Sequence, residues 1–274
     1  MKKNAFLVAS ALVCASVPAF ADGTVDGGNI FGILTVESKS ADTIVAVPWC
    51  ECSTNDNQSV SISNIVKTAN LTVGDELYSL NSSREKLYKW VLESEGGTNY
   101  WQGYRMVSNS GTVDNAIPSA SATAVRGTAI ILHRQNPITI NGVTTNAVPF
   151  YLYGQVGTNS TVNTVIASGS SAAPAYTLIA PPIVSSSVAI PGEVMSGMQS
   201  GDSIVTRSTQ TGVNREYTYN GSQWEYITRT HSGGKITTVT NKVDSISLAC
   251  GTGAWYVSRN TTAPTLTWKN LPHK

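Results

Sequence analysis

The chain has 274 residues, of which 41% are hydrophobic and only 13% charged, and its formal net charge is +1. So small a net charge gives no support to a partner held by long-range electrostatics, such as nucleic acid or an anionic membrane surface. The length suffices for one large or two small hydrophobic cores. The low charge favours an exported β-protein, kept soluble by hydroxyl and amide groups, over a cytosolic enzyme.

The first residues, MKKNAFLVASALVCASVPAFA, predict a signal peptide at 1–21. Two lysines precede an apolar run that is shorter than the about 20 residues of a membrane-spanning helix. Ala19-Phe20-Ala21 has the small-x-small pattern of a cleavage site. Cleavage would remove Lys2 and Lys3 and leave a formal net charge of −1. We therefore expect a bacterial protein that is exported to the periplasm, the outer surface or the medium.

Short segments of alternating apolar and polar residues fill the rest of the chain, and no window keeps helical spacing for three turns. In VLESEGGTNYW, a turn at Gly96-Gly97 would set Leu92 opposite Trp101. In ITINGVTT, Asn141-Gly142 predicts the tip of a second hairpin. These signals predict an all-β fold.

A third hairpin is expected in REYTYNGSQWEYI, where Asn220-Gly221 favours a two-residue type I′ turn. Such a turn would set Tyr219 opposite Ser222 and Tyr217 opposite Trp224.

Four pairs of segments recur in the same order along the chain, which indicates an internal duplication. The pairs are TIVAVPW (from Thr43) with TLIAPPI (from Thr177), VGDELYSL (from Val73) with SGDSIVTR (from Ser200), NYWQGYRMV (from Asn99) with SQWEYITRT (from Ser222), and GTAIILHRQN (from Gly127) with GTGAWYVSRN (from Gly251). We expect two tandem related small β-barrels or β-sandwiches: copy A at 22–156, a linker or long loop at 157–175, and copy B at 176–274.

The stretch SGDSIV presents Ser203 after Gly-Asp, as one family of serine esterases presents its nucleophile. In the repeat alignment, however, Ser203 takes the place of Glu76, so the shared element is a Gly-Asp turn that leads into a strand. A nucleophile also needs a base, and the mature chain offers only His133, His231 and His273. We therefore predict no catalytic residue, no cofactor and no enzymatic activity.

The acidic residues do not suggest a glycosidase pair, since the sequence places them at turns or on outward strand positions. We expect solvated carboxylates at Asp75, Glu85, Glu93, Glu95, Asp202, Glu216 and Glu225.

Three cysteines remain in the mature chain: Cys50, Cys52 and Cys250. In an oxidising compartment the favoured interpretation is one disulfide between Cys250 and either Cys50 or Cys52, with the third thiol buried or paired with another chain. A zinc site of three thiolates is the alternative, and we predict no metal.

Tryptophan and tyrosine rings on a β-surface could bind a sugar, but a tryptophan that recurs in both copies, as Trp101 and Trp224 do, more often belongs to a core. The candidate ligand-contact residues are the rings that repeat least, Trp255 and Trp268, together with Tyr256.

Copy B, with Gly201-Asp202, Trp224 and GTGAWYVSRN from Gly251, resembles uncharacterised secreted duplicated β-domain proteins of Verrucomicrobia and Planctomycetes-type bacteria. Copy A departs from that pattern, because GTAIILHRQN lacks the third-position glycine and the tryptophan. The resemblance implies an exported β-protein and transfers no catalytic residue.

The sequence thus predicts a non-enzymatic cell-envelope or surface protein that presents a β-face to an envelope component, a surface glycan or a protein, and that has no membrane-spanning helix. One alternative is a carbohydrate-binding module with exposed tryptophan and tyrosine. The other is a hydrolase with an unrecognised site, which needs His133 or His231 beside a serine or carboxylate.

Overall fold

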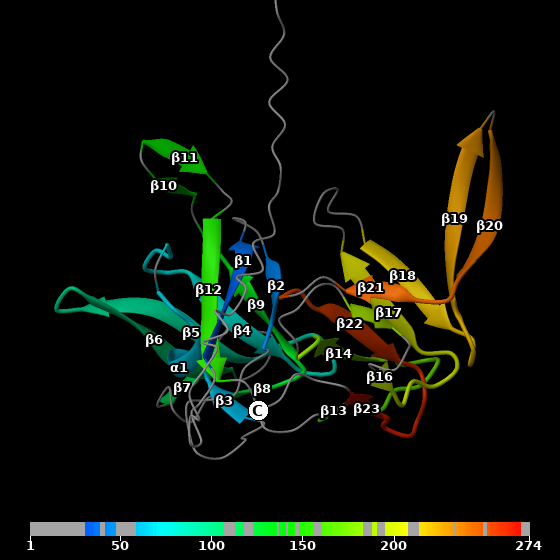
Figure 1. Ribbon diagram of the computed structural model, residues 1–274, viewed down its shortest axis with the longest axis horizontal. Helices are drawn as coiled ribbons and strands as arrows, with labels where there is room; N and C mark the ends of the chain where they lie inside the picture. Colours follow the sequence, from blue (N-terminus) through cyan, green and yellow to red (C-terminus); the bar gives the residue numbers. More distant parts are fainter. Residues whose placement is uncertain are drawn as a thin grey trace, which may run out of the picture.

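The computed structural model describes residues 31–38, 42–47, 59–68, 70–106, 113–117, 123–135, 137–140, 142–145, 148–155, 161–182, 188–190, 195–207, 214–232, 234–248 and 251–269. The predicted signal peptide and the three mature cysteines lie outside these residues. The described chain is almost entirely β-strand, with one helical turn, α1 (Ile62–Ile65), so the all-β prediction is confirmed (Figure 1).

Two six-stranded antiparallel sheets form the body, one in each half of the chain. The first sheet runs in the order β2 (Thr43–Ala46), β9 (Ala129–His133), β4 (Glu76–Leu80), β5 (Lys86–Glu95), β6 (Thr98–Met106) and β7 (Val113–Ile117). The second runs in the order β14 (Ala175–Ile179), β22 (Ala254–Ser258), β17 (Ser203–Arg207), β18 (Asn214–Tyr219), β19 (Trp224–Ser232) and β20 (Lys235–Val243).

Smaller sheets complete each half. The first half, up to residue 155, has the pairs β1 (Phe31–Ser38) with β12 (Val148–Gln155), β3 (Ser59–Ser61) with β8 (Thr123–Val125), and β10 (Ile138–Ile140) with β11 (Val143–Thr145). The second half, from residue 161, has β15 (Val188–Ile190) with β21 (Ile246–Leu248), and a sheet of β13 (Val162–Val165), β23 (Thr265–Trp268) and β16 (Met195–Ser196).

Strand order corresponds between the two halves. Each six-stranded sheet begins with the strand of the first repeated segment, β2 or β14. Next comes the strand after the repeated Gly-Thr, β9 or β22, and then the strand after the repeated Gly-Asp, β4 or β17. The remaining three strands follow in chain order in both sheets. The β3–β8 and β15–β21 pairs occupy matching places along the chain. The shared order agrees with the repeated segments, while their origin by duplication stays a prediction.

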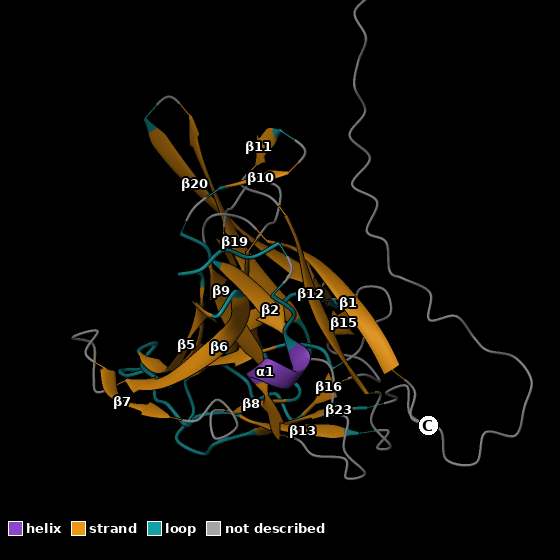
Figure 2. Cartoon of the chain, turned by 90° about the vertical axis from the view of Figure 1, so that its left-hand side faces the viewer, coloured by secondary structure: helices purple, strands orange, loops and turns teal. Residues whose placement is uncertain are grey.

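Each half has its own hydrophobic core, because alternate residues of its strands turn to one face of the sheet. Large rings fill both cores: Trp90, Trp101 and Phe150 in the first half, and Trp224, Tyr256 and Trp268 in the second. Figure 2 views the same arrangement from the side of the first half. The expectation that the repeated Trp101 and Trp224 belong to cores is confirmed.

The halves meet through reciprocal contacts. Val45 bridges to Thr252, and Ile179 bridges to Thr128, which are the corresponding residues of the repeated segments. A third apolar cluster lies at this junction and consists of Ala46, Tyr78, Ala129, Ile131, Leu178 and Ala180, with Ile44, Leu80 and Trp255 packed against it.

Two hairpin predictions are confirmed, and one is wrong in its register. Leu92 does lie opposite Trp101, and Ile140 pairs with Val143 across the tip of the second hairpin. In the third hairpin, however, Trp224 lies opposite Tyr219 rather than opposite Tyr217.

The segment 157–175, expected to be a linker or long loop, contains β13. This strand pairs with β23 near the C-terminus, and its Val162 is buried in the second core. Part of the expected linker is therefore integral to the second half.

Candidate functional site

The feature that stands apart from the body is a ribbon formed by β19 and β20. These strands pair from Trp224 opposite Val243 to Ser232 opposite Lys235. The neighbouring strand β18 pairs only with Trp224 and Glu225 of β19. Beyond that point β19 and β20 continue as two strands, which project at the right of Figure 1. We call residues 226–232 and 234–241 the arm.

The sequence of the arm favours a strand and exposes apolar surface at the same time. Threonine, isoleucine and valine make up most of it, and β-branched side chains prefer extended backbone. Ile227 is 59% exposed, Ile236 58% and Val239 47%. Ile227 and Ile236 share one face with Arg229 and His231, since residues opposite one another in the register point to the same side.

Both long edges of the arm lack a strand partner among the described residues, because β20 is the last strand of the sheet order and the pairing of β18 with β19 ends at Glu225. Backbone N–H and C=O groups on such edges are open to a further strand. The arm therefore offers backbone hydrogen bonds together with an apolar surface.

A second ribbon projects from the first half. β4 pairs with β5 only as far as Val91, and β7 pairs with β6 only from Gly103 onward. The part beyond, residues 92–102, continues as a hairpin, which we call the acidic hairpin because it carries Glu93 and Glu95 and no cation.

Glu93 is held within the acidic hairpin by two tyrosines. The hydroxyl of Tyr104 donates to Oε1 of Glu93 at 2.5 Å, and the hydroxyl of Tyr100 donates to Oε2 at 3.2 Å. The hydrogen bond to the Glu93 carboxylate, assisted by burial, raises the pKa of Tyr104 to about 12. Glu95, nearer the tip, is exposed and has no ion-pair partner in the described part of the chain.

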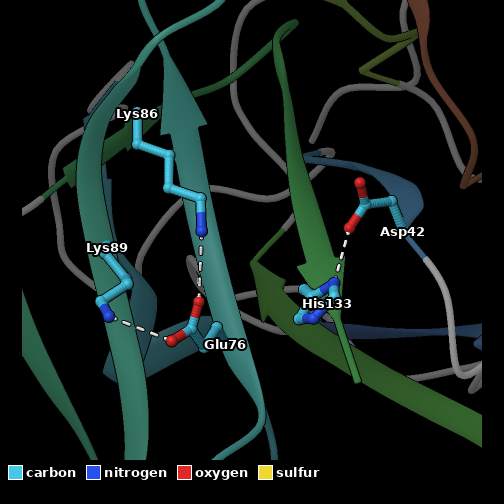
Figure 3. Close-up of polar contacts among 5 residues, drawn as sticks. All are labelled: Asp42, Glu76, Lys86, Lys89 and His133. Atoms are coloured by element: carbon cyan, nitrogen blue, oxygen red, sulfur yellow. Dashed lines mark hydrogen bonds and ion pairs between the residues drawn. The ribbon is translucent and has the colours of Figure 1, made fainter. Parts of the chain in front are cut away.

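A polar cluster lies on the face of the first sheet that points away from the first core (Figure 3). Glu76 accepts from Nζ of Lys89 at 3.0 Å and of Lys86 at 3.3 Å. Partial burial raises the pKa of Glu76, but hydrogen bonds and charges from the two lysines outweigh it, so the pKa falls below its usual value. Nδ1 of His133 lies 2.8 Å from Oδ1 of Asp42.

The pair of His133 and Asp42 has the form that orients a general base. His133 lies opposite Glu76 in the register of β4 and β9, and the hydroxyl of Tyr78 is hydrogen-bonded to Asp42, so these four titratable groups share the region with the two lysines. No described hydroxyl is in hydrogen-bond contact with His133, and Glu76 is engaged by its lysines. The cluster holds charges in place and presents no described nucleophile.

The two Gly-Asp turns have the same backbone geometry, with Gly74 and Gly201 at φ of 96° and 91°. Their aspartates, however, are not solvated as expected, since Asp75 and Asp202 are both 0% exposed. The carboxylate of Asp75 accepts from the backbone N–H groups of Thr72 at 3.0 Å and Gln135 at 3.2 Å.

Asp202 accepts a denser set of hydrogen bonds. The donors are the Tyr256 hydroxyl at 2.7 Å, the backbone N–H of Arg259 at 2.8 Å and the side-chain amide of Asn260 at 2.7 Å. Burial and the bond to Asp202 raise the pKa of Tyr256. Each Gly-Asp aspartate thus ties its turn to the end of the neighbouring strand.

Ser203 follows this turn as the first residue of β17 and is fully buried. Its hydroxyl lies 3.2 Å from that of Thr218 and accepts from Nη1 of Arg259 at 2.5 Å. The same guanidinium reaches Glu216 through Nη2 at 2.7 Å. The serine is part of a structural network.

The structure places the three candidate ligand-contact residues in or beside packed clusters. Tyr256 and Trp268 are fully buried, and Nε1 of Trp268 donates to the Thr164 hydroxyl at 3.0 Å. Trp255 is half-buried at the junction of the halves, edge-on to Tyr176 with ring centroids 6.1 Å apart. A role in ligand contact would require Tyr256 and Trp268 to leave the second core.

Sequence reasoning missed the arm and the acidic hairpin as surfaces. The β-branched run in KITTVTNK was a usable signal for a strand. The exposure of this strand depends on where β19 loses its pairing with β18 and on β20 being the last strand of the sheet, and no local sequence pattern reports either.

Within the described ranges, no cluster of three or more histidine, cysteine, aspartate or glutamate side chains could hold a metal ion. The described residues also include no helix of the length and apolarity that crossing a membrane requires. No protein-family model, curated protein or solved structure matches the chain. The resemblance to secreted proteins of Verrucomicrobia and Planctomycetes-type bacteria stays a prediction.

Proposed function

We propose that this chain is an exported, non-enzymatic protein of the cell envelope or surface, which binds a partner through the arm. The observation that carries the proposal is the exposure of Ile227 and Ile236 on a ribbon whose two edges have no described strand partner.

An exposed β-edge is normally protected, because it can pair with strands of other chains. Here the central part of β20, from Ile236 to Asn241, carries no charge and is rich in threonine and valine. Apolar side chains gathered on an exposed element mark interaction sites. The matching mode of recognition is addition of a strand from the partner, with backbone hydrogen bonds for affinity and Ile227 and Ile236 for specificity.

The positions of the residues considered for catalysis support a binding role rather than an enzymatic one. Asp202 and Ser203 are buried in hydrogen-bonded networks. Of the rings offered for ligand contact, Trp268 and Tyr256 are buried and Trp255 is half-buried, and the repeated Trp101 and Trp224 are buried as well. These placements favour a binding protein over the alternatives of a hydrolase or a carbohydrate-binding module.

Export is proposed from the sequence, with 1–21 as the removed signal peptide. The link between Cys250 and one of Cys50 or Cys52 is part of the same proposal. The described residues nearest the cysteines support it, since the N–H of Ala46 donates to the carbonyl of Gly251 at 2.9 Å.

The test measures the envelope-bound fraction of the protein in producing cells for an arm variant and for a control variant elsewhere on the surface. Ile227→Thr with Ile236→Thr removes apolar area while keeping β-branching, so the arm should fold normally. Val165→Thr is the control, because Val165 is 72% exposed but lies on β13, outside the arm. We expect the envelope-bound fraction of the arm variant to be about tenfold smaller than that of the wild type, and the fraction of the control to be unchanged. Unchanged retention of the arm variant, or an uncleaved protein in the cytoplasm, would refute the proposal.

A further inference from the structure

We infer that the partner of the arm is a second copy of this chain, which offers its acidic hairpin to the arm in a head-to-tail assembly. This inference rests on the proposed role of the arm and names its occupant.

The two ribbons carry opposite charges. From Tyr226 to Asn241 the chain has Arg229, Lys235 and His231 and no acidic residue. The acidic hairpin has Glu93 and Glu95 and no basic residue. Among the described residues, no ion pair engages Arg229, Lys235 or Glu95. Each ribbon therefore has charge that its own half leaves uncompensated.

The ribbons lie at opposite ends of the molecule. Figure 1 sets the longest axis horizontal, with the β5–β6 hairpin extending at the left and the arm at the right. The arm and the acidic hairpin of one chain consequently cannot meet, whereas those of two chains can. Because the two surfaces differ, each arm–hairpin contact is heterologous, and contacts repeated from chain to chain give a ring or a filament.

The backbone of both ribbons suits the contact. Each is a two-stranded segment with edges that no described strand covers. An isolated two-stranded ribbon is at best marginally stable in water, and three or more strands are needed for independent stability. Pairing the ribbons edge to edge would make a four-stranded sheet and satisfy N–H and C=O groups on both.

Side chains also match on one face. Glu93, Glu95 and Tyr100 point to the same side of the acidic hairpin, because Glu93 is opposite Tyr100 and two residues from Glu95. On the arm, Arg229 shares its side with the exposed Ile227. Edge pairing can thus set carboxylates beside Arg229 and the partly exposed ring of Tyr100 beside Ile227, while Lys235, opposite Ser232, lies on the other face of the arm.

The proposed contact uses exposed charges, so added salt should weaken it. The Debye length shortens from about 30 Å at 0.01 M to about 3 Å at 1 M ionic strength. Self-association is therefore expected to be strongest at low ionic strength.

The experiment is sedimentation velocity on the purified mature chain at low and high ionic strength, using charge-reversed variants. The arm-reversed protein carries Arg229→Glu and Lys235→Glu, and the hairpin-reversed protein carries Glu95→Lys, at a carboxylate that has no ion-pair partner among the described residues. Lys269→Glu is the control, because Lys269 is exposed and lies outside both ribbons. Circular dichroism verifies that every variant keeps its β-structure.

We expect the wild type and the control to form salt-sensitive oligomers, and each reversed protein alone to associate at least tenfold more weakly. An equimolar mixture of the two reversed proteins should associate again, because the arm-reversed protein then offers carboxylates to the cation that Glu95→Lys introduces in the other hairpin. A wild type that is monomeric up to about 0.1 mM at low salt, reversals without effect, or a mixture that stays monomeric would each overturn the inference.

This outcome is separable from failure of the proposed function. If the chain is monomeric and Ile227→Thr with Ile236→Thr still loses envelope retention, the arm binds a different partner and only the inference of self-assembly falls. If envelope retention is also unchanged, both the proposed function and the inference of self-assembly are contradicted.

Discussion

The backbone N–H of Ala46 in the first half donates to the carbonyl of Gly251 in the second at 2.9 Å. The reciprocal bond, from Ala180 to Gly127, is 3.1 Å long. Since these residues correspond in the repeated segments, each half gives the other the same donor and acceptor. The junction is therefore an approximately twofold contact inside one chain, as in a symmetric dimer.

Gly253 lies at this junction, and replacing it with alanine should destabilise the protein. An added Cβ would lie 2.7 Å from Cβ of Ala129 and 2.8 Å from the carbonyl oxygen of Ile179, closer than van der Waals contact allows. Overpacking of this kind costs about 1–3 kcal/mol. Urea unfolding of Gly253→Ala should show that loss, whereas Ser247→Ala, at an exposed position of β21, should stay within about 0.5 kcal/mol of the wild type. Equal stability of Gly253→Ala would contradict the packing described here.

Asp202→Asn should lower the free energy of unfolding, although the two side chains have nearly the same volume. The carboxylate accepts from Tyr256, Arg259 and Asn260, and the amide group of asparagine would turn a donor toward those donors. Hydrogen bonds to charged groups are worth about 1.5–3 kcal/mol, and we expect a loss of free energy of unfolding in that range.

The matched control for Asp202 is Tyr256→Phe, which removes a single donor and should cost about 1 kcal/mol. Denaturant unfolding measures both variants. If Asp202→Asn were no less stable than Tyr256→Phe, the carboxylate would not be the anchor of the turn.

Stability should depend on pH through Glu76. Its folded-state pKa is lowered below the ordinary 4.5, so its contribution is complete above that pH and is lost as the pH falls through the folded value. Glu76→Gln should therefore be about 0.5–1 kcal/mol less stable than the wild type at neutral pH and indistinguishable from it at the acid end.

Thermal unfolding at a series of pH values below neutral measures this convergence. Glu225→Gln serves for comparison, since Glu225 is more exposed and its lysine, Lys242, is 3.9 Å away. A gap between wild type and Glu76→Gln that persists unchanged into acid would contradict the role given to the lysines.

The proposed disulfide can be tested directly on the purified protein by peptide mapping. Trypsin without reduction should yield a linked pair of peptides, 40–67 with both Cys50 and Cys52, and 243–259 with Cys250. Reduction should separate them into their individual masses. Recovery of peptide 243–259 only with a free thiol would contradict the proposed disulfide between the halves.

Local turn chemistry explains which hairpin could be predicted. Gly96-Gly97 closes a two-residue loop, so Leu92 opposite Trp101 followed from the sequence. At Asn220 the side-chain oxygen accepts from the N–H groups of Ser222 and Gln223, and the Asn220 N–H donates to the Gln223 carbonyl. This Asx-type turn makes a longer loop, which moved Trp224 opposite Tyr219.

The candidate site was harder to predict than the fold class. Alternation in the sequence indicated strands, but the burial of Asp202 depends on donors more than 50 residues away in the chain. Likewise, the exposure of Ile227 and Ile236 follows from the early end of the pairing between β18 and β19, which is a property of the assembled sheet.

The central claim is that the arm is the binding surface, and amide hydrogen exchange tests it most directly. Peptides of the protein in isolated envelopes would be compared with those of the purified chain at high ionic strength, where we expect it to be monomeric. Edge amides of the arm, within residues 226–241, should exchange fast in the monomer and at least tenfold more slowly in the envelope, while β13 stays unchanged. Equal exchange of the arm in both states, with protection elsewhere, would contradict the claim.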